Sequence, residues 1–200
     1  MRSVLNIGLI LSLVFVVASC AKPPTQELDA AKTAVAAAKQ GEADVYAPET
    51  FRSATNALND ANSKIEQKDY EGAKASAIQA KELADRSKSE ADNSKQQTRD
   101  EAQAIINRVA AGLSDARSSI DQAPKGKGAD EDLDQLRADL SQGETSLSDA
   151  RNSINTGKFK DALAQARSAE GKLSQVQGSV QTAMQKIEEW KKQNQPWYKL

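Results

Sequence analysis

The sequence contains few residues capable of chemistry. Its 200 residues include no histidine and one cysteine, Cys20. Histidine is the commonest general base and cysteine a common nucleophile, and neither occurs in the body of the chain. The acidic runs Asp130-Glu131-Asp132 and Glu188-Glu189 do not compensate, because adjacent residues of a helix point to different faces. We therefore expect no enzymatic activity, no metal site and no cofactor.

Cys20 follows a segment with the pattern of a secretory signal. Arg2 makes the first residues positive, and the apolar stretch behind it is too short to span a membrane. The sequence Val17-Ala18-Ser19-Cys20 resembles a bacterial lipobox, which implies that residues 1–19 are a signal peptide and that Cys20 is lipidated. An ordinary secretory signal with an incidental cysteine is the alternative. By the same resemblance, Ala21 in place of aspartate implies the outer membrane, with the protein facing the periplasm.

The other end of the chain carries large aromatic residues. Trp190, Trp197 and Tyr198 lie within its last eleven positions, and both tryptophans of the sequence are among them. Tryptophan and tyrosine are enriched at the centres of protein interfaces, so the group predicts a partner-binding tip. Alternatively, Trp190 belongs to a helix core and the tail folds back over it. Lys199 is penultimate, so we do not favour attachment to peptidoglycan through a terminal lysine.

The charge balance excludes one class of partner. The chain has 27 basic and 28 acidic residues, and loss of Arg2 with the signal leaves 26 against 28. This balance gives no electrostatic basis for binding nucleic acid. Aromatic residues form only 4% of the chain, which is too little bulk for a large globular core. Thin helices packed through alanine are expected instead.

One long helix organises the predicted fold. Small or apolar residues recur every three or four positions from Tyr70 to Ile120, with a polar interruption from Asn93 to Asp100. This heptad spacing predicts a helix of about 75 Å at 1.5 Å per residue. Thr98 begins a capping-box pattern, so a break there is the alternative to a continuous rod. The seam consists of Ala73, Ala77, Ala80, Ala84, Ser87, Ala91, Ser94, Ala102, Ile105, Val109, Leu113, Ala116 and Ile120.

Shorter helices are expected on both sides of this rod. Paired prolines exclude helix from the tether, residues 20–26, and Gly41 ends the first helix. A turn from Asp44 to Ala47 leads to a second helix that starts at Pro48, and Gln122 to Asp130 form a loop. The last helix has an unbroken heptad seam at Phe159, Ala162, Ala166, Ala169, Leu173, Val176, Val180, Ala183, Ile187 and Trp190.

The chain also repeats itself at a shift of 89 residues. We infer two units, residues 27–97 and 98–192, followed by an aromatic tail at 193–200. Shared alanine richness is the alternative explanation. The matched pairs include Leu58 with Leu147, Ala61 with Ala150, Ile65 with Ile154, Tyr70 with Phe159, Ala73 with Ala162 and Ala77 with Ala166.

One segment resembles a known family. Tyr46-Ala47-Pro48-Glu49, followed by an alanine heptad and Asp69-Tyr70, is similar to an uncharacterised domain of unknown function in bacterial helical lipoproteins. That domain sometimes precedes an OmpA-like domain. The resemblance covers about Gln26 to Lys95 and implies a helical fold and an envelope location, without an activity. The second unit has Pro124-Lys125-Gly126-Lys127-Gly128 instead, so the two turns are expected to differ in role.

Together these observations predict an all-α protein. We expect an elongated antiparallel coiled-coil bundle, with two helical-hairpin repeats that share one long central helix. Its expected function is that of a structural spacer or adaptor of the bacterial cell envelope, held to the membrane by an N-terminal lipid. Its partner would be an envelope protein or a second copy. A periplasmic module that binds a peptide or ligand in a groove between helices is the alternative.

Overall fold

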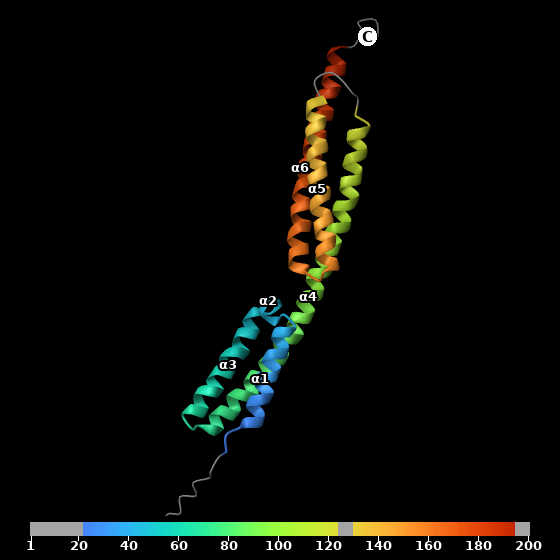
Figure 1. Ribbon diagram of the computed structural model, residues 1–200. Helices are drawn as coiled ribbons and strands as arrows, with labels where there is room; N and C mark the ends of the chain where they lie inside the picture. The colour runs from blue at the N-terminus through green and yellow to red at the C-terminus, as the bar shows by residue number, and fades with distance from the viewer. Residues whose placement is uncertain (1–21, 124–129, 195–200) are drawn as a thin grey trace, which may run out of the picture.

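The computed structural model describes residues 22–123 and 130–194, and in this part of the chain there is no strand. Six helices form an elongated rod (Figure 1). The prediction of an all-α bundle around one long central helix is confirmed. Cys20, Trp197, Tyr198 and most of the predicted loop at 122–130 lie outside the described residues. The helices are α1 Thr25–Gln40, α2 Ala43–Tyr46, α3 Pro48–Glu66, α4 Tyr70–Asp121, α5 Asp130–Asn155 and α6 Phe159–Gln193.

The central helix α4 is continuous over 52 residues, about 78 Å at the usual rise per residue. Asp69 caps its start, because the carboxylate accepts a hydrogen bond from the amide of Gly72 at 3.0 Å. Every predicted seam residue is buried except Ser94, which is half-buried. The Thr98 hydroxyl donates to the carbonyl of Ser94 at 2.7 Å, one turn earlier in the same helix, so it does not cap a new one. The continuous rod is therefore confirmed.

The first bundle consists of α1, α2, α3 and the first half of α4 (Figure 1). Alanine dominates its core, and small side chains let the helix axes approach closely. The long α3 begins at Pro48, as predicted, since proline fits the first helical position. The buried alanines without any exposed surface are Ala31, Ala38, Ala43, Ala54, Ala61, Ala73, Ala77, Ala80, Ala84 and Ala91.

The second bundle consists of α5, α6 and the second half of α4. Its core contains larger aliphatic side chains, with Ile106, Ile120, Val109 and Val176 the largest that are fully buried. The helices α4 and α6 approach closely at Gly112. A Cβ atom there would lie 2.4 Å from Cδ2 of Leu173, so glycine leaves the space that leucine fills.

Two predicted boundaries near the first bundle are wrong. The tether was expected to reach Gln26, but α1 starts at Thr25, directly after the prolines, and the Leu28 amide donates to the Pro24 carbonyl at 3.0 Å. The expected turn from Asp44 to Ala47 is mostly the short helix α2. Gly41 ends α1, as predicted. The left-handed residue of that connection is the next one, Glu42. Local residue preferences do not predict features as short as one helical turn, such as the start of α1 or the helix α2.

The corners that end α3 and α5 have the same hydrogen bonds at a shift of 89 residues. The amide of Asp69 donates to the Lys64 carbonyl at 2.9 Å, and the amide of Lys158 donates to the Ser153 carbonyl, also at 2.9 Å. One residue earlier, the amides of Lys68 and Gly157 donate to Ile65 and Ile154. The sequence repeat therefore coincides with a structural repeat at these corners.

A polar bridge beside each corner also recurs. In the first unit the Lys64 ammonium donates to the hydroxyl of buried Ser76 at 2.9 Å. In the second unit the Ser153 hydroxyl donates to Oε1 of Gln165 at 2.7 Å. These four residues also correspond at a shift of 89. Each bridge joins two consecutive helices one turn from their corner, although the residue types differ.

Candidate functional site

The distal end of the rod is where α6 ends beside the end of α4 and the start of α5 (Figure 1). Trp190 lies there, one turn before the end of α6, and is half-buried. Its backbone carbonyl accepts hydrogen bonds from the amide and the side chain of Asn194, at 3.1 and 2.9 Å. The preceding seam residue, Ile187, is buried in the core. Trp190 thus continues the seam at the point where the bundle opens to solvent.

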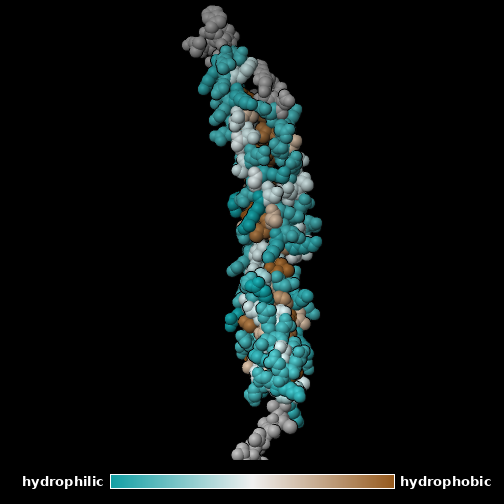
Figure 2. Space-filling model, turned by 90° about the vertical axis from the view of Figure 1, so that its left-hand side faces the viewer, coloured by the Kyte–Doolittle hydropathy of each residue, from teal (hydrophilic) through white to brown (hydrophobic). Residues whose placement is uncertain are grey.

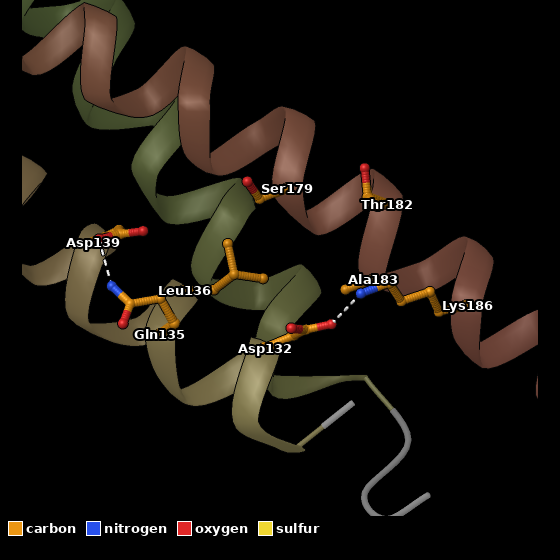
Figure 3. A pocket seen from close by; sticks show the side chains of 8 residues that line it. All are labelled: Asp132, Gln135, Leu136, Asp139, Ser179, Thr182, Ala183 and Lys186. Carbon is orange, nitrogen blue, oxygen red and sulfur yellow. Dashed lines mark hydrogen bonds and ion pairs between the residues drawn. The ribbon is translucent and has the colours of Figure 1, made fainter. Parts of the chain in front are cut away.

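A shallow groove lies between α5 and α6 near this end (Figure 3). Its volume is about 230 Å3, and its lining includes buried Leu136 and Ala183. Polar side chains surround these two residues. Lys186 donates to Asp132 at 2.7 Å across the groove, joining the two helices. The groove therefore offers a small apolar floor under a charged rim.

The surface of the rod is mostly hydrophilic. Figure 2 shows apolar residues as separate spots along the visible face, without a continuous band. Among the described residues, the exposed large hydrophobic side chains are Val45 and Ile78. The heptad seams are consequently used for packing within the molecule.

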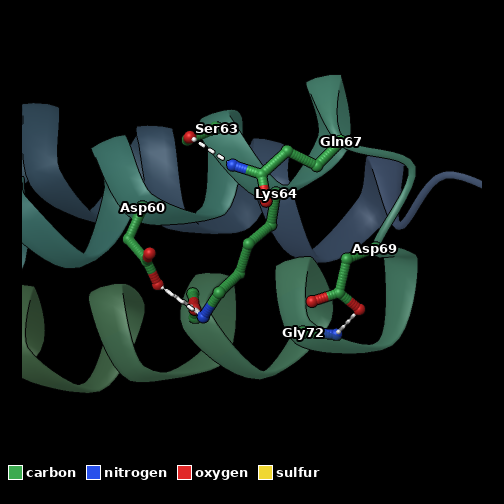
Figure 4. A network of polar contacts seen from close by, with 7 residues as sticks. Asp60, Ser63, Lys64, Gln67, Asp69 and Gly72 are labelled. Atoms are coloured by element: carbon green, nitrogen blue, oxygen red, sulfur yellow. Dashed lines mark hydrogen bonds and ion pairs between the residues drawn. The ribbon is translucent and has the colours of Figure 1, made fainter.

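The proximal end carries a polar network between α3 and α4 (Figure 4). The Asp60 carboxylate accepts hydrogen bonds from Lys64 at 2.7 Å and from the Ser76 hydroxyl at 2.5 Å. The bond from Lys64, and next the bond from Ser76, lower the pKa of Asp60. Nearby, Lys74 pairs with Glu27 at 3.0 Å, which ties the start of α1 to α4 and lowers the pKa of Glu27.

The two bundles also meet end to end, about halfway along the rod (Figure 1). The Lys160 ammonium donates to the carbonyl of Val45 at 2.6 Å and lies 5.2 Å from the centre of the Tyr46 ring. The Lys95 ammonium lies 5.5 Å from the same ring, and Arg99 lies 5.9 Å from the ring of Phe159. Distances within about 6 Å allow cation–π attraction. We call these five side chains, Tyr46, Lys95, Arg99, Phe159 and Lys160, the joint.

Sequence reasoning did not find the joint. The resemblance singled out Tyr46, and the repeat singled out Phe159, but neither was connected with the lysines. A signal was present in the alignment of the two units. Asp69 and Glu71 at the start of α4 correspond to Lys158 and Lys160 at the start of α6, where positive charge opposes the helix dipole.

The described residues contain neither a metal-binding cluster nor a membrane-spanning helix. No group of three or more acidic or cysteine side chains in the described ranges is arranged to hold a metal ion. No helix in the same ranges is both long and apolar enough to cross a bilayer.

The predicted family resemblance rests on the segment that joins α2 to α3, with Tyr46 in the joint and Pro48 at the start of α3. Residues 26–105 match the family described as Domain of unknown function (DUF4398). The DUF4398 region comprises nearly all of the first bundle and the part of α4 that crosses to the second. It extends past Lys95, where the resemblance was expected to end. The prediction of an uncharacterised domain-of-unknown-function family is confirmed. Comparisons with curated proteins and with solved structures gave no match to this chain.

Proposed function

We propose that this protein is a non-enzymatic lipoprotein of the bacterial cell envelope that acts as a spacer or adaptor. A lipid on Cys20 holds one end at the membrane, and the distal end binds a partner. The observation that carries this proposal is that the first and the last described helix lie at opposite ends of the rod (Figure 1). The helix α1 begins at one end of the rod and α6 finishes at the other, with the roughly 78 Å of α4 between them (Figure 1).

The packing supports a standoff role. Buried alanine seams join the helices of the first bundle, and larger aliphatic residues fill the second. The corners at 67–69 and 156–158 are short and hydrogen-bonded, so neighbouring helices stay antiparallel. A molecule of this kind holds its tip at a fixed distance from its anchor.

The tip would supply the specific contact. Half-buried Trp190 marks the end of the second bundle, and Trp197 and Tyr198 follow it in the sequence. Aromatic residues at the end of a narrow rod can bury a large area against a partner of limited size. The partner would be an envelope protein or a second copy of the chain.

The distal groove gives less support to a module that binds peptides. Its apolar floor consists of Leu136 and Ala183, and its volume is below the range of about 300–1,000 Å3 that ligand pockets usually have. The ion pair between Lys186 and Asp132 would also have to open before a chain could enter.

Crosslinking and capture from intact cells tests the proposal. We would compare the full chain with a chain that lacks residues 191–200 and with the double variant Trp197→Ala/Tyr198→Ala. The matched control is Lys191→Ala/Lys192→Ala, which changes the charge of the tip and keeps its aromatic residues. Loss of one partner with the first two variants, and its retention with the control, supports an adaptor with an aromatic tip. Equal capture by all four chains would place the partner site elsewhere, and the groove would be examined next.

A further inference from the structure

The helix α4 passes between the bundles through a stretch that belongs to neither core. No residue of α4 between Ala91 and Ala102 is fully buried. Residues 93–100, which we call the neck, are polar throughout, and α4 is the one described helix that crosses there (Figure 1). The neck therefore lacks the apolar packing that stiffens α4 above and below it.

The joint provides the contacts beside the neck. Lys95 and Arg99 lie on the neck itself, and each faces an aromatic ring of a different bundle, Tyr46 in the first and Phe159 in the second. Among the described residues, Lys160 alone bridges the bundles without involving α4, through the Val45 carbonyl and the Tyr46 ring. An open cleft of about 230 Å3 lies beside these contacts, lined in part by Glu42, Gly157 and Asp161. The end-to-end contact between the bundles thus rests on few side chains.

Comparison of the two corners shows that Lys160 destabilises the start of its own helix, α6. In the first unit the helix starts with Asp69, which caps it, and Glu71, which suits the positive end of the helix dipole. In the second unit Lys158 makes no capping bond, and Lys160 occupies the counterpart of Glu71. Both changes weaken the start of α6. A violation of local preference of this kind is expected where a residue serves a tertiary contact.

The Val45 carbonyl and the Tyr46 ring are suited to bind the Lys160 ammonium. Val45 lies in the last turn of α2, where backbone carbonyls lack partners within the helix and carry partial negative charge. Tyr46 is buried, so its ring presents a fixed face to the two ammonium groups of Lys95 and Lys160. An acidic residue at position 160 would be repelled by the same carbonyl and ring.

We propose that the Lys160 contact with Val45 and Tyr46 is a lock that holds the two bundles in line, and that the molecule bends at the neck when it is broken. The turn that carries the family resemblance would thereby fix the direction of the segment that follows the DUF4398 region. This inference stands on the joint geometry and does not depend on an anchor or a binding tip.

Distance measurement between two spin labels tests the lock. The full chain would carry Cys20→Ala, so that cysteines introduced at exposed Asn59 in α3 and exposed Ser174 in α6 are the only thiols. Double electron–electron resonance then reports the distance distribution between the two bundles. The variants are Lys160→Glu and Lys160→Ala, with Lys158→Ala as the matched control in the same corner and Lys160→Arg as the conservative change.

We expect a narrow distribution for the parent chain, Lys158→Ala and Lys160→Arg. For Lys160→Glu and Lys160→Ala we expect a broader distribution that extends to shorter distances. Lys160→Glu should keep or raise the melting temperature, because glutamate favours the start of α6. Circular dichroism checks that helicity is unchanged, and if Lys160→Glu loses helix, Lys160→Ala decides. An unchanged narrow distribution in the deciding variant, or a parent distribution as broad as that variant's, would overturn the proposal.

Discussion

Lys68 and Gly157 lie at equivalent positions of the two units and share a left-handed backbone conformation, with φ of 62° and 76°. Each directly follows the C-cap residue in a Schellman ending, where its amide and the next one donate to carbonyls of the preceding turn. Glycine adopts this conformation without steric cost, whereas a lysine does not. The same corner is therefore built from a favourable residue in one unit and an unfavourable one in the other.

This difference leads to a prediction for Gly157→Ala. No atom lies within 4 Å of the added methyl group, so the change tests the backbone conformation alone. We expect the free energy of unfolding to fall by about 1–2 kcal/mol, the cost of left-handed geometry for a residue with a Cβ atom. Urea denaturation followed by helicity measures it. Gly171→Ala in α6, which also meets nothing within 4 Å, is the control and should gain roughly 0.5–1 kcal/mol. Effects of the same sign at both sites would contradict this account.

The alanine seam predicts a large effect of Ala77→Glu. Ala77 has no exposed surface, and a glutamate there would bury an unpaired charge or force the helices apart. We expect a loss of more than about 3 kcal/mol in the free energy of unfolding. Ala75→Glu introduces the same side chain on the same helix at an exposed position and should be nearly neutral. The same test applies to Ala166→Glu in the second bundle, where the alanine is also fully buried. Similar melting temperatures for Ala77→Glu and Ala75→Glu would refute the seam.

The lowered pKa of Asp60 predicts that the stability of the protein depends on pH. Hydrogen bonds from Lys64 and then Ser76 lower its pKa from the ordinary value of 3.8. A group with a lowered folded-state pKa stabilises the protein above its unfolded-state value, and this contribution is lost as pH falls through the folded-state pKa. We therefore expect Asp60→Asn to melt at a lower temperature than the parent at neutral pH. This difference in melting temperature should become smaller as the pH falls below 3.8, the ordinary pKa of Asp60. Melting curves over that range measure it.

The matched control for this experiment is Asp149→Asn, the counterpart of Asp60 in the second unit. There the two neighbouring positions hold Ser153 and Gln165, which bond to each other and carry no charge. A constant gap between Asp60→Asn and the parent across the pH range would show that the network contributes no pH-dependent stability.

The proposed anchor predicts the behaviour of Cys20→Ala. Without the thiol no thioether-linked lipid can form, so the protein should move from the membrane fraction to the soluble fraction of the envelope. Fractionation with detection of the chain measures this. Ser19→Ala keeps a small residue before the cysteine and should remain with the membrane. Membrane retention of Cys20→Ala would remove the anchor from the proposed function.

The joint is the clearest case of what sequence reasoning missed. Tyr46 was identified through the family resemblance, and Phe159 through the repeat, but their partners could not be assigned. Val45 and Lys160, which form the contact between the bundles, are 115 residues apart. Periodicity along one helix carries no information about which residue of a distant corner reaches it.

By itself the sequence determined the all-α class, the long central helix with a possible break at Thr98, and the buried seam positions, including Ala77, Ala166 and Val109. These follow from local spacing, because a helix places residues three and four apart on one face. Only the tertiary structure decided that α2 is a short helix against the corner of the second bundle, and that Lys160 reaches Tyr46 there. The physical reason is that such contacts depend on how two packed bundles meet, which is a relation between distant segments that no local pattern encodes.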